Sequence, residues 1–387
     1  MPYDVVNTEE ARAEIARTPR SFLRVVRPEA EFPQGTDPYS DAVYAKAAAN
    51  YRAFRQEGLL VQEPSPQLYL YRLVMGAHSQ RGIVACCHIE EYENRVIKRH
   101  ELTREDKRRD RIRLTEALGA HAGLVFMAYR DSEAIDEAMT TVEDHNAPLL
   151  DFVSALDVRH TVWRIPRQER IVALFAGVAA AYIADGHHRA EAAVEIGRCR
   201  RAANRRHTGA EEYNWFPAAL FPAGQLRILP YNRAVHDLNG LGAAEFLRAC
   251  RTAFDVGEGG RPEPGRANIF SMYMAGKWYS LTRRNSAGRV LDPVSVLDVN
   301  YLQEELLAPV LGIRDPRKDK RIEFVGGIRG TAELKRMVDR GEAQVAFSLH
   351  PVTVTQMMDI ADAGLIMPPK STWFEPKLKS GLLVHEY

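Results

Sequence analysis

Cysteine is scarce in this sequence, with four residues among 387, at positions 86, 87, 199 and 250. No two of them form a C-x-x-C pair, the spacing typical of thiolate metal sites and redox motifs. Cys86 and Cys87 are adjacent in a strand-like run, so we expect their side chains to point to opposite faces. The sequence therefore predicts four reduced thiols in a cytoplasmic protein and argues against a metal site built from cysteine.

The chain also lacks long apolar runs and an excess of either charge. No stretch approaches the roughly 20 apolar residues that a membrane-spanning helix requires. The opening MPYDVVNTEEARAEIAR has neither the basic flank nor the apolar core of a signal peptide. The formal net charge of +1 provides no general attraction for nucleic acid or an anionic membrane. We expect neither as a partner, and the oligomeric state stays open.

Two familiar phosphate-binding signatures are missing as well. The sequence contains no P-loop pattern, G-x-x-x-x-G-K-[ST], and no HRD or DFG element of the protein kinases. Its apolar and charged fractions, 45% and 27%, are those of an ordinary globular protein. Any phosphoryl transfer must therefore use another scaffold.

Helix and strand patterns are mixed along the chain and predict a mixed-sheet α/β or α+β fold. Residues 40–58 have a serine cap, helical spacing and a closing glycine, so they predict a helix. The runs QLYLYRLVM and RGIVACCHIEEY flank a polar turn and predict an antiparallel hairpin. SFLRVVRPE (21–29) is expected to form a strand, and the Gly/Pro-rich DVGEGGRPEPGR (255–266) a linker.

The segment AAYIADGHHRAEAAVEIGR, residues 180–198, changes character in its middle. An apolar, strand-like run ends at Asp185, and an alanine-rich helix follows Gly186. The first turn of a helix carries unpaired amide hydrogens and about half a positive charge, so it attracts phosphate. Gly186 has no side chain to keep an anion from the backbone.

The other residues of this turn suit the same chemistry. Arg189 supplies a planar fork that can hold two phosphate oxygens, and His187 and His188 add donors. Asp185 can hold Mg²⁺ beside a polyphosphate or accept a proton from a nucleophile. The alternative is that Asp185 caps the helix while the histidines pack. Because all five residues occur together, a phosphate site is the favoured interpretation.

Three further segments contain candidates that are weak when taken alone. In KRHELTREDKRRDR (98–111), Glu101 precedes a predicted helix start and can serve as a general base, although an ordinary surface acid is the commoner case. In MPPKSTWFEPKLKSG (367–381), a lysine and two hydroxyls suit an anion or a carboxylate, although a solvated loop is the commoner case. In LPYNR (229–233), Arg233 follows a strand and is a candidate to face the site.

These segments occur in the same order in a known group of proteins. ADGHHRAEAA resembles the phosphate-binding signature of the ParB/sulfiredoxin-like superfamily, and the closest motifs are those of the free serine kinases, which phosphorylate the hydroxyl of L-serine. Over its whole length the chain is similar to a widespread bacterial family that shares PYDV, IADGHHR, LPYNR and PPKSTYF-like elements. The resemblance to the serine kinases covers about residues 97–380 and is discontinuous.

The resemblance implies a division of the chain into three parts. Residues 1–96 would form an N-terminal α+β extension of open function, and residues 97–253 a ParB/sulfiredoxin-like nucleotide-binding core with a mixed sheet and an insertion at 131–170. Residues 267–387 would form a C-terminal α/β part that binds substrate. Family members usually carry a short segment before PYDV, so we expect that this chain starts late or has been trimmed there.

The resemblance also implies an activity: a small-molecule kinase that uses ATP or ADP with Mg²⁺ to phosphorylate free L-serine or a similar hydroxy compound. Glu101 would be the catalytic base, and His100 would orient it or touch phosphate. Asp185 would assist the base or hold Mg²⁺. The nucleotide phosphates would be held by Gly186, His187, His188 and Arg189. The substrate would be held by Lys370, Ser371, Thr372 and Arg233.

Two other functions fit parts of the pattern. ParB-type relatives use the corresponding turn to bind CTP as a conformational switch on DNA, so a non-catalytic nucleotide switch or a phosphoserine sensor is the main alternative. A switch has no need of Glu101, and this chain shows no basic recognition helix. A sulfiredoxin-like repair enzyme requires a cysteine inside the turn, where this chain has histidine.

Overall fold

A computed structural model describes residues 6–284 and 292–387, and the PYDV element at 2–5 lies outside them. The chain forms two compact units, between which it passes four times. Unit 1 comprises Met1–Arg99, Thr103–Leu226 and Pro376–Tyr387, and unit 2 comprises His100–Leu102 and Arg227–Glu375. The three-part division and the insertion at 131–170 stay predictions.

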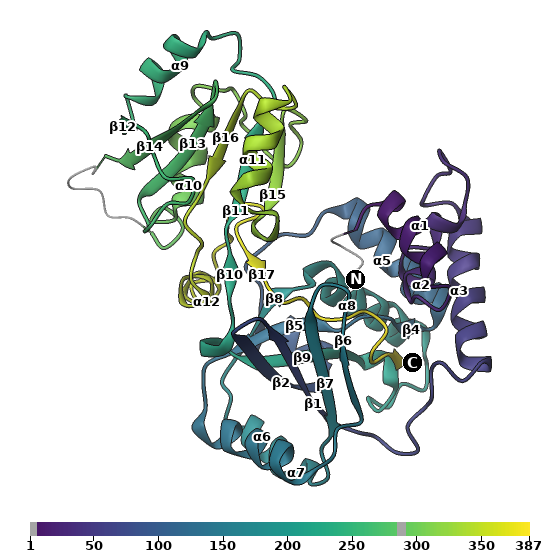
Figure 1. Cartoon of the computed structure of the whole chain (residues 1–387). Helices are drawn as coiled ribbons and strands as arrows, with labels where there is room; N and C mark the ends of the chain where they lie inside the picture. Colours follow the sequence, from purple (N-terminus) through teal and green to yellow (C-terminus); the bar gives the residue numbers. More distant parts are fainter. Residues whose placement is uncertain (1–5, 285–291) are drawn as a thin grey trace. The chain divides into compact units, whose positions relative to one another are not determined.

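Unit 1 is built on an eight-stranded mixed sheet (Figure 1), in the order β3-β8-β5-β9-β2-β1-β7-β6. The pairs β3–β8 and β5–β9 are parallel, and the other neighbours are antiparallel. The strands are β1 (Tyr69–Met75), β2 (His78–His88), β3 (Ile97–Lys98), β5 (Val125–Tyr129), β6 (Leu150–Val153), β7 (Val158–Arg164), β8 (Ala181–Asp185) and β9 (Trp215–Pro222). The predicted mixed α/β fold class is confirmed.

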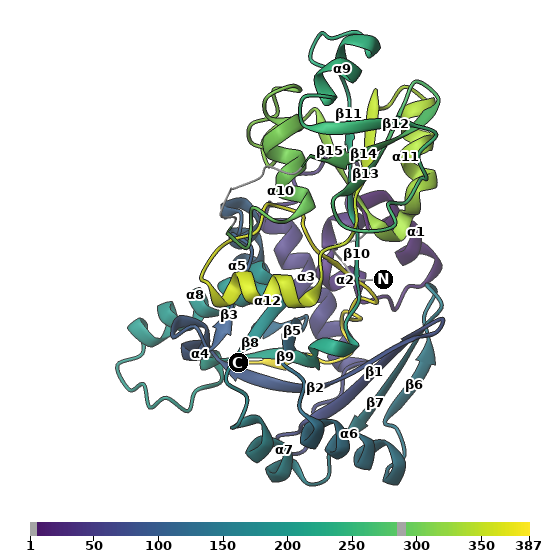
Figure 2. The ribbon, with the colours of Figure 1, turned by 90° about the vertical axis from the view of Figure 1, so that its left-hand side faces the viewer.

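The helices of unit 1 belong to two apolar clusters. The sheet shares one with α6, α7 and α8, while α2, α3 and α5 contribute to the other. The helices are α1 (Thr8–Arg17), α2 (Leu23–Val26), α3 (Asp41–Gln56), α4 (Ile89–Glu93), α5 (Glu105–Leu118), α6 (Glu133–His145), α7 (Gln168–Phe175) and α8 (His187–Ala203). Figure 2 shows α6 and α7 side by side, as in Figure 1.

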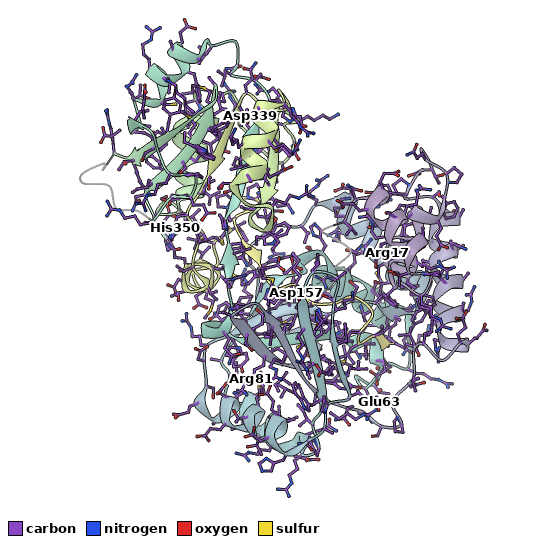
Figure 3. The ribbon with its side chains drawn as sticks, in the orientation of Figure 1. Arg17, Glu63, Arg81, Asp157, Asp339 and His350 are labelled. Carbon is purple, nitrogen blue, oxygen red and sulfur yellow. The ribbon has the colours of Figure 1, made fainter. Side chains whose placement is uncertain are left out.

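A partly exposed ion-pair network ties α6 to β2. Arg81, labelled in Figure 3, donates to Glu143 at 2.7 Å and to Asp136 at 2.8 Å. Because its guanidinium has partners on successive turns of one face of the helix, α6 is held in one rotation against the sheet. At the other end of the chain, β18 (His385–Glu386) pairs with β4 (Ala120–His121) and fixes the C-terminus in unit 1.

Several local predictions can be compared with these elements. The helix expected at 40–58 and the hairpin of β1 and β2 are confirmed. The strand expected at 21–29 is wrong, because α2 and a 3₁₀ turn (Pro28–Glu31) occupy it. Leu23, Val25 and Val26 are all buried there, which fits one face of a helix packed on α3 better than the alternation of a strand. The four cysteines are free thiols, as predicted.

Unit 2 contains a six-stranded antiparallel sheet in the order β12-β14-β13-β16-β11-β15. Its strands are β11 (Tyr231–Val235), β12 (Phe254–Glu258), β13 (Ile269–Met274), β14 (Lys277–Arg283), β15 (Ile322–Gly326) and β16 (Val345–Ser348), and β10 (Ile228–Leu229) pairs separately with β17 (Trp373–Phe374). The first residues of the predicted linker belong to β12, so a linker beginning at 255 is wrong. Pairing with β14 outweighs the local glycine content.

The helices of unit 2 are α9 (Ala243–Cys250), α10 (Asp298–Leu302), which continues into a π-helical turn (Gln303–Leu307), α11 (Gly330–Asp339) and α12 (Val354–Asp362). The connection β15–α11–β16 places two parallel strands on either side of β11. Among the described residues of both units, we find no helix with the length and apolar character needed to cross a bilayer.

Candidate functional site

The turn between β8 and α8 has a backbone that only glycine adopts easily. Gly186 has a φ of 98°, in the left-handed region. Its carbonyl accepts hydrogen bonds from the amides of Arg189 at 2.9 Å and Ala190 at 3.0 Å, which starts the helix. Since Gly186 occupies the capping position without a side chain, the structure agrees with the predicted strand–turn–helix junction.

The guanidinium of Arg189 folds back onto this turn. Its Nη2 atom donates to Oδ2 of Asp185 at 2.7 Å, and its Nη1 atom donates to the carbonyl of Leu124. A Cβ atom at Gly186 would lie 3.0 Å from the guanidinium carbon, and one at Gly123 would lie 3.4 Å from Nη1. Two glycines therefore make room for the guanidinium, and the arginine is part of the wall of the turn.

A lysine that the sequence analysis missed completes this cluster. Lys377 donates from Nζ to Oδ1 of Asp185 at 3.0 Å, and its side chain is 10% exposed. Burial by itself raises the pKa of Asp185, but the charges of Lys377 and Arg189 outweigh it and hold that pKa well below its usual value. A sequence feature could have pointed to Lys377, since Pro376-Lys377 repeats the Pro-Lys pair of Pro369-Lys370 seven residues earlier.

The two histidines of the turn have different surroundings. His187 is buried. His188 accepts a hydrogen bond at Nε2 from the amide of Arg104, at 3.0 Å. That amide belongs to the residue that precedes α5, so His188 connects the first turn of α8 to the start of α5. Since Nε2 accepts, the ring hydrogen is on Nδ1.

In unit 2, the segment 367–373 is held by the buried Arg233. This guanidinium is 3% exposed and donates from Nη2 to the carbonyl oxygens of Lys370 at 3.0 Å and Pro369 at 3.4 Å. Burial lowers the pKa of Arg233. Its Nη1 donates to the carbonyl of Tyr231 at 2.6 Å, and the guanidinium lies 4.6 Å from the ring centroid of Phe324. Arg233 thus joins β11 to the backbone of the loop, and its direct role in unit 2 is to position Lys370.

The same segment contacts the His-Glu pair, which lies far away in the sequence. The ring Nε2 of His100 is 3.3 Å from Oγ1 of Thr372, and the carbonyl of His100 accepts from the amide of Met367 at 2.8 Å. His100 is 1% exposed, and Glu101, which follows it, is half-buried. Unit 2 thus brings together the His100-Glu101 pair, which was predicted to contain the base, and residues 367–373, which were predicted to hold the substrate and are called the substrate loop below.

Within the substrate loop, Ser371 bonds to the loop's own backbone, whereas Lys370 lies beside an aromatic ring. Ser371 donates to the carbonyl of Pro368 at 2.6 Å, which closes a tight turn. Lys370 has a left-handed φ of 56°, and its Nζ lies 5.5 Å from the ring centroid of Tyr231. Among the predicted site residues, unit 1 therefore groups Asp185, Gly186, His187, His188 and Arg189, and unit 2 groups His100, Glu101, Arg233, Lys370, Ser371 and Thr372.

Comparisons with known proteins give one family and several distant structures. The model of the family described as "Protein of unknown function (DUF1015)" matches residues 1–300. A search of the curated proteins finds no match. A point mutant of free serine kinase in complex with AMP is 15% identical, with 75% of this chain and 87% of that chain covered and a TM-score of 0.39.

Two further solved structures are similar to this chain at the same level. A conserved hypothetical protein from Pyrococcus furiosus is 15% identical, with coverage of 77% and 93% and a TM-score of 0.38. SbnI with a C-terminal truncation, from Staphylococcus aureus, is 12% identical, with coverage of 78% and 87% and a TM-score of 0.42.

Proposed function

We propose that this chain, which belongs to the DUF1015 family, is a small-molecule kinase that transfers a phosphoryl group from ATP or ADP to the hydroxyl of free L-serine or a similar compound. The observation that carries the proposal is the 3.3 Å contact between His100 and Thr372, which are 272 positions apart. It joins two segments that the motif resemblance assigns to one reaction. Between them they contain a carboxylate that can act as a base, a cation and a hydroxyl.

The proposed chemistry needs few covalent steps. Glu101 takes the proton of the acceptor hydroxyl, the hydroxyl oxygen attacks the terminal phosphorus, and the bond to the leaving nucleotide breaks. Lys370 and Thr372 offer a cation and a hydroxyl to the substrate or to the moving phosphoryl group. Arg233 acts through the loop backbone, because its Nη2 is engaged by the carbonyl groups of that loop.

In unit 1, the proposed nucleotide site is the turn from Gly186 to Arg189. Gly186 places no side chain over the helix start, and the backbone there suits phosphate oxygens. Mg²⁺ fits this turn less well, because both carboxylate oxygens of Asp185 already accept from Lys377 and Arg189. We derive no step through a metal, and Asp185 as its ligand stays a prediction of the resemblance.

The direct test combines purified protein with Mg·ATP or Mg·ADP and L-serine, with O-phosphoserine detected by ³¹P NMR and mass spectrometry. We expect Glu101→Gln to keep nucleotide affinity within about twofold and to lower turnover by about 10²–10⁴-fold, the usual effect of losing a general base. Glu105→Gln, an exposed acid at the start of α5, is the matched control and should keep full activity.

Two results would count against the kinase. If no combination of nucleotide and small hydroxy compound gives a phosphorylated product, the proposed reaction is wrong. If nucleotide binds with the same affinity to the wild type and to Glu101→Gln but neither turns over, the nucleotide-binding switch is the better description.

A further inference from the structure

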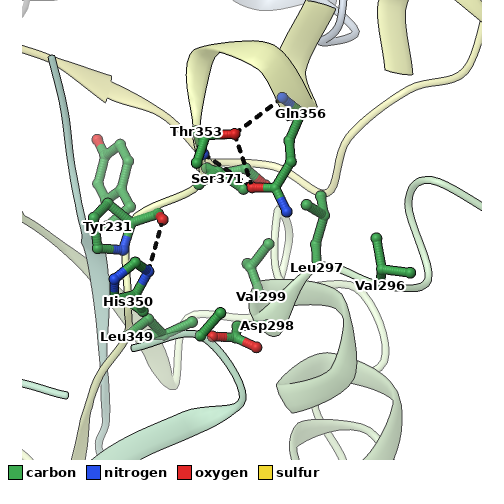
Figure 4. A pocket seen from close by; sticks show the side chains of 13 residues that line it. Tyr231, Val296, Leu297, Asp298, Val299, Leu349, His350, Thr353, Gln356 and Ser371 are labelled. Atoms are coloured by element: carbon green, nitrogen blue, oxygen red, sulfur yellow. Dashed lines mark hydrogen bonds between the residues drawn. The ribbon is translucent and has the colours of Figure 1, made fainter. Parts of the chain in front are cut away.

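Unit 2 contains a pocket beside the substrate loop, with about 550 Å³ of empty space that is partly open to solvent (Figure 4). It lies between the start of α10, the connection from β16 to α12, the start of β11 and the substrate loop. Apolar side chains such as Leu297 form one wall, and a small number of polar groups face them. This combination is typical of small-molecule sites.

The most unusual group in the wall is the carboxyl of Asp298. The residue is 7% exposed, and its two oxygens share one backbone donor, the amide of Asn268, at 3.0 Å each. An ionised carboxylate has about four acceptor positions, so this one retains capacity toward the pocket. Burial raises its pKa to about 6, while the hydrogen bond from Asn268 and the nearby His350 and Arg283 act in the opposite direction. A buried carboxylate of this kind is stabilised by a bound cation.

The imidazole of His350 lies in the same wall and is oriented by the backbone. Its Nδ1 is 3.1 Å from the carbonyl oxygen of Pro351, which can only accept, so Nδ1 carries the hydrogen. The other ring nitrogen, Nε2, is the atom of His350 that is left to hydrogen-bond a ligand. Asp298 offers acceptors to a group with several N–H donors, and His350 offers one further hydrogen-bonding atom, which together suit a primary ammonium beside a hydroxyl.

The pocket borders the residues of the proposed reaction. Ser371 lines it, and the next residue, Thr372, contacts His100. Tyr231 also lines the pocket, and its ring carries the ammonium of Lys370 at 5.5 Å. A ligand in the pocket would therefore meet the carboxylate of Asp298 in the wall and the ring of Tyr231, beside which Lys370 lies.

We propose that this pocket binds a small molecule that carries a protonated amine and a hydroxyl, with Asp298 as the counter-charge of the amine and His350 as a hydrogen-bonding partner of the hydroxyl. That this ligand is the phosphoryl acceptor rests on the proposed function, whereas its binding does not. The acceptor class is thereby narrowed to amino alcohols and hydroxy amino acids.

Calorimetric titration of the full chain, with and without ADP, tests the proposal with three probes. Ethanolamine and L-serine have the amine and the hydroxyl, and 3-hydroxypropanoate has serine's hydroxyl and carboxylate without the amine. We expect the wild type to bind both amines at least tenfold more tightly than 3-hydroxypropanoate. Asp298→Asn should lose at least tenfold in affinity for the amines, and Asp255→Asn, an exposed acid of the same unit, should lose none.

The outcomes separate this inference from the kinase. If the amines bind through Asp298 and no phosphorylated product forms, the pocket assignment stands and the reaction is wrong. If product forms but Asp298→Asn leaves both amine affinities and the KM of the acceptor unchanged, the pocket assignment is wrong. Absence of binding by all three probes, with and without ADP, also overturns it. Circular dichroism and Tm of Asp298→Asn show whether a loss reflects misfolding, and Asp298→Glu, which keeps the charge, should retain part of the amine preference.

Discussion

The ammonium of Lys377 lies 3.0 Å from the carboxylate of Asp185, although 192 positions separate the two residues. The carboxylate also accepts from Arg189, so one acid lies between two cations. This arrangement stores one net positive charge beside the start of α8, where a phosphate group would bind. Lys377 therefore joins the residues of the turn in the candidate nucleotide site.

Replacing Lys377 by methionine should destabilise unit 1 and weaken nucleotide binding. Asp185 would keep only one of its two cations, and a partly buried carboxylate that loses a charged hydrogen bond costs about 1–3 kcal/mol. Urea unfolding at pH 7 measures the change. Lys318→Ala, in which the lost lysine is 87% exposed, is the control and should stay within about 0.5 kcal/mol. Equal losses in both variants would contradict the role of the pair.

The same cluster predicts a dependence of stability on pH. Because the folded-state pKa of Asp185 is held below its ordinary value of 3.8, the unfolded chain binds more protons between those two values. The contribution of Asp185 to stability is thus complete above about pH 4 and is lost as the pH falls through the depressed folded-state pKa. Wild type should lose more stability than Asp185→Asn when the pH is lowered from 5 to 3. Identical pH profiles would show that the cluster does not lower the pKa of Asp185.

Replacing Gly186 by alanine should cost more than a positive φ alone explains. A Cβ atom there would lie 3.0 Å from the Arg189 guanidinium, whereas Gly58, with a φ of 70°, has nothing within 4 Å. Gly58→Ala should lose about 1 kcal/mol for the backbone strain. We expect Gly186→Ala to lose about 1 kcal/mol more and to shift Arg189, which thermal unfolding and nucleotide titration measure. A cost no larger than that of Gly58→Ala would mean that the guanidinium moves freely.

Replacing Arg233 by lysine should loosen the substrate loop without removing the charge. Lysine lacks the guanidinium whose Nη2 donates to Pro369 and Lys370 and whose Nη1 donates to Tyr231, so about 1.5–3 kcal/mol of stability should be lost. Hydrogen exchange at residues 367–373 should speed up, and the acceptor KM should rise. Arg321→Lys, at a 33% exposed arginine of the same unit, is the control. Unchanged exchange in the loop would exclude the positioning role.

Replacing Asp298 by asparagine should raise the free energy of unfolding at pH 7, whereas the replacements above lower it. The folded-state pKa of about 6 exceeds the ordinary 3.8, so between these values the folded chain binds more protons than the unfolded chain. Wild-type stability from this group therefore falls as the pH rises from 4 to 6, by an amount on the order of 1–3 kcal/mol. The asparagine variant lacks this decrease and should gain relative stability at pH 7. A parallel pH profile for the two proteins would contradict the buried carboxylate.

Much of the local structure follows from local sequence. Caps, closing glycines and alternation predict α3, the hairpin of β1 and β2 and the junction at Asp185 and Gly186, because these signals act within a few residues. The segment 21–29 shows the limit of such signals, since its apolar residues suit strand or helix and burial against α3 selects the helix. The start of the expected linker became β12 for the same reason, because pairing with β14 is non-local.

The sequence by itself determined which residues are of the right chemical kind, namely Asp185 to Arg189, the His-Glu pair and the Pro-Lys-Ser-Thr segment. Only the tertiary structure decided how they are engaged: Arg189 and Lys377 around one carboxylate, Arg233 on a loop backbone, and His100 against Thr372. A motif records which side chains are present, whereas hydrogen bonds and burial depend on neighbours that are a hundred or more positions away. The pocket around Asp298 belongs to the second kind, because its wall is assembled from segments that share no sequence signal.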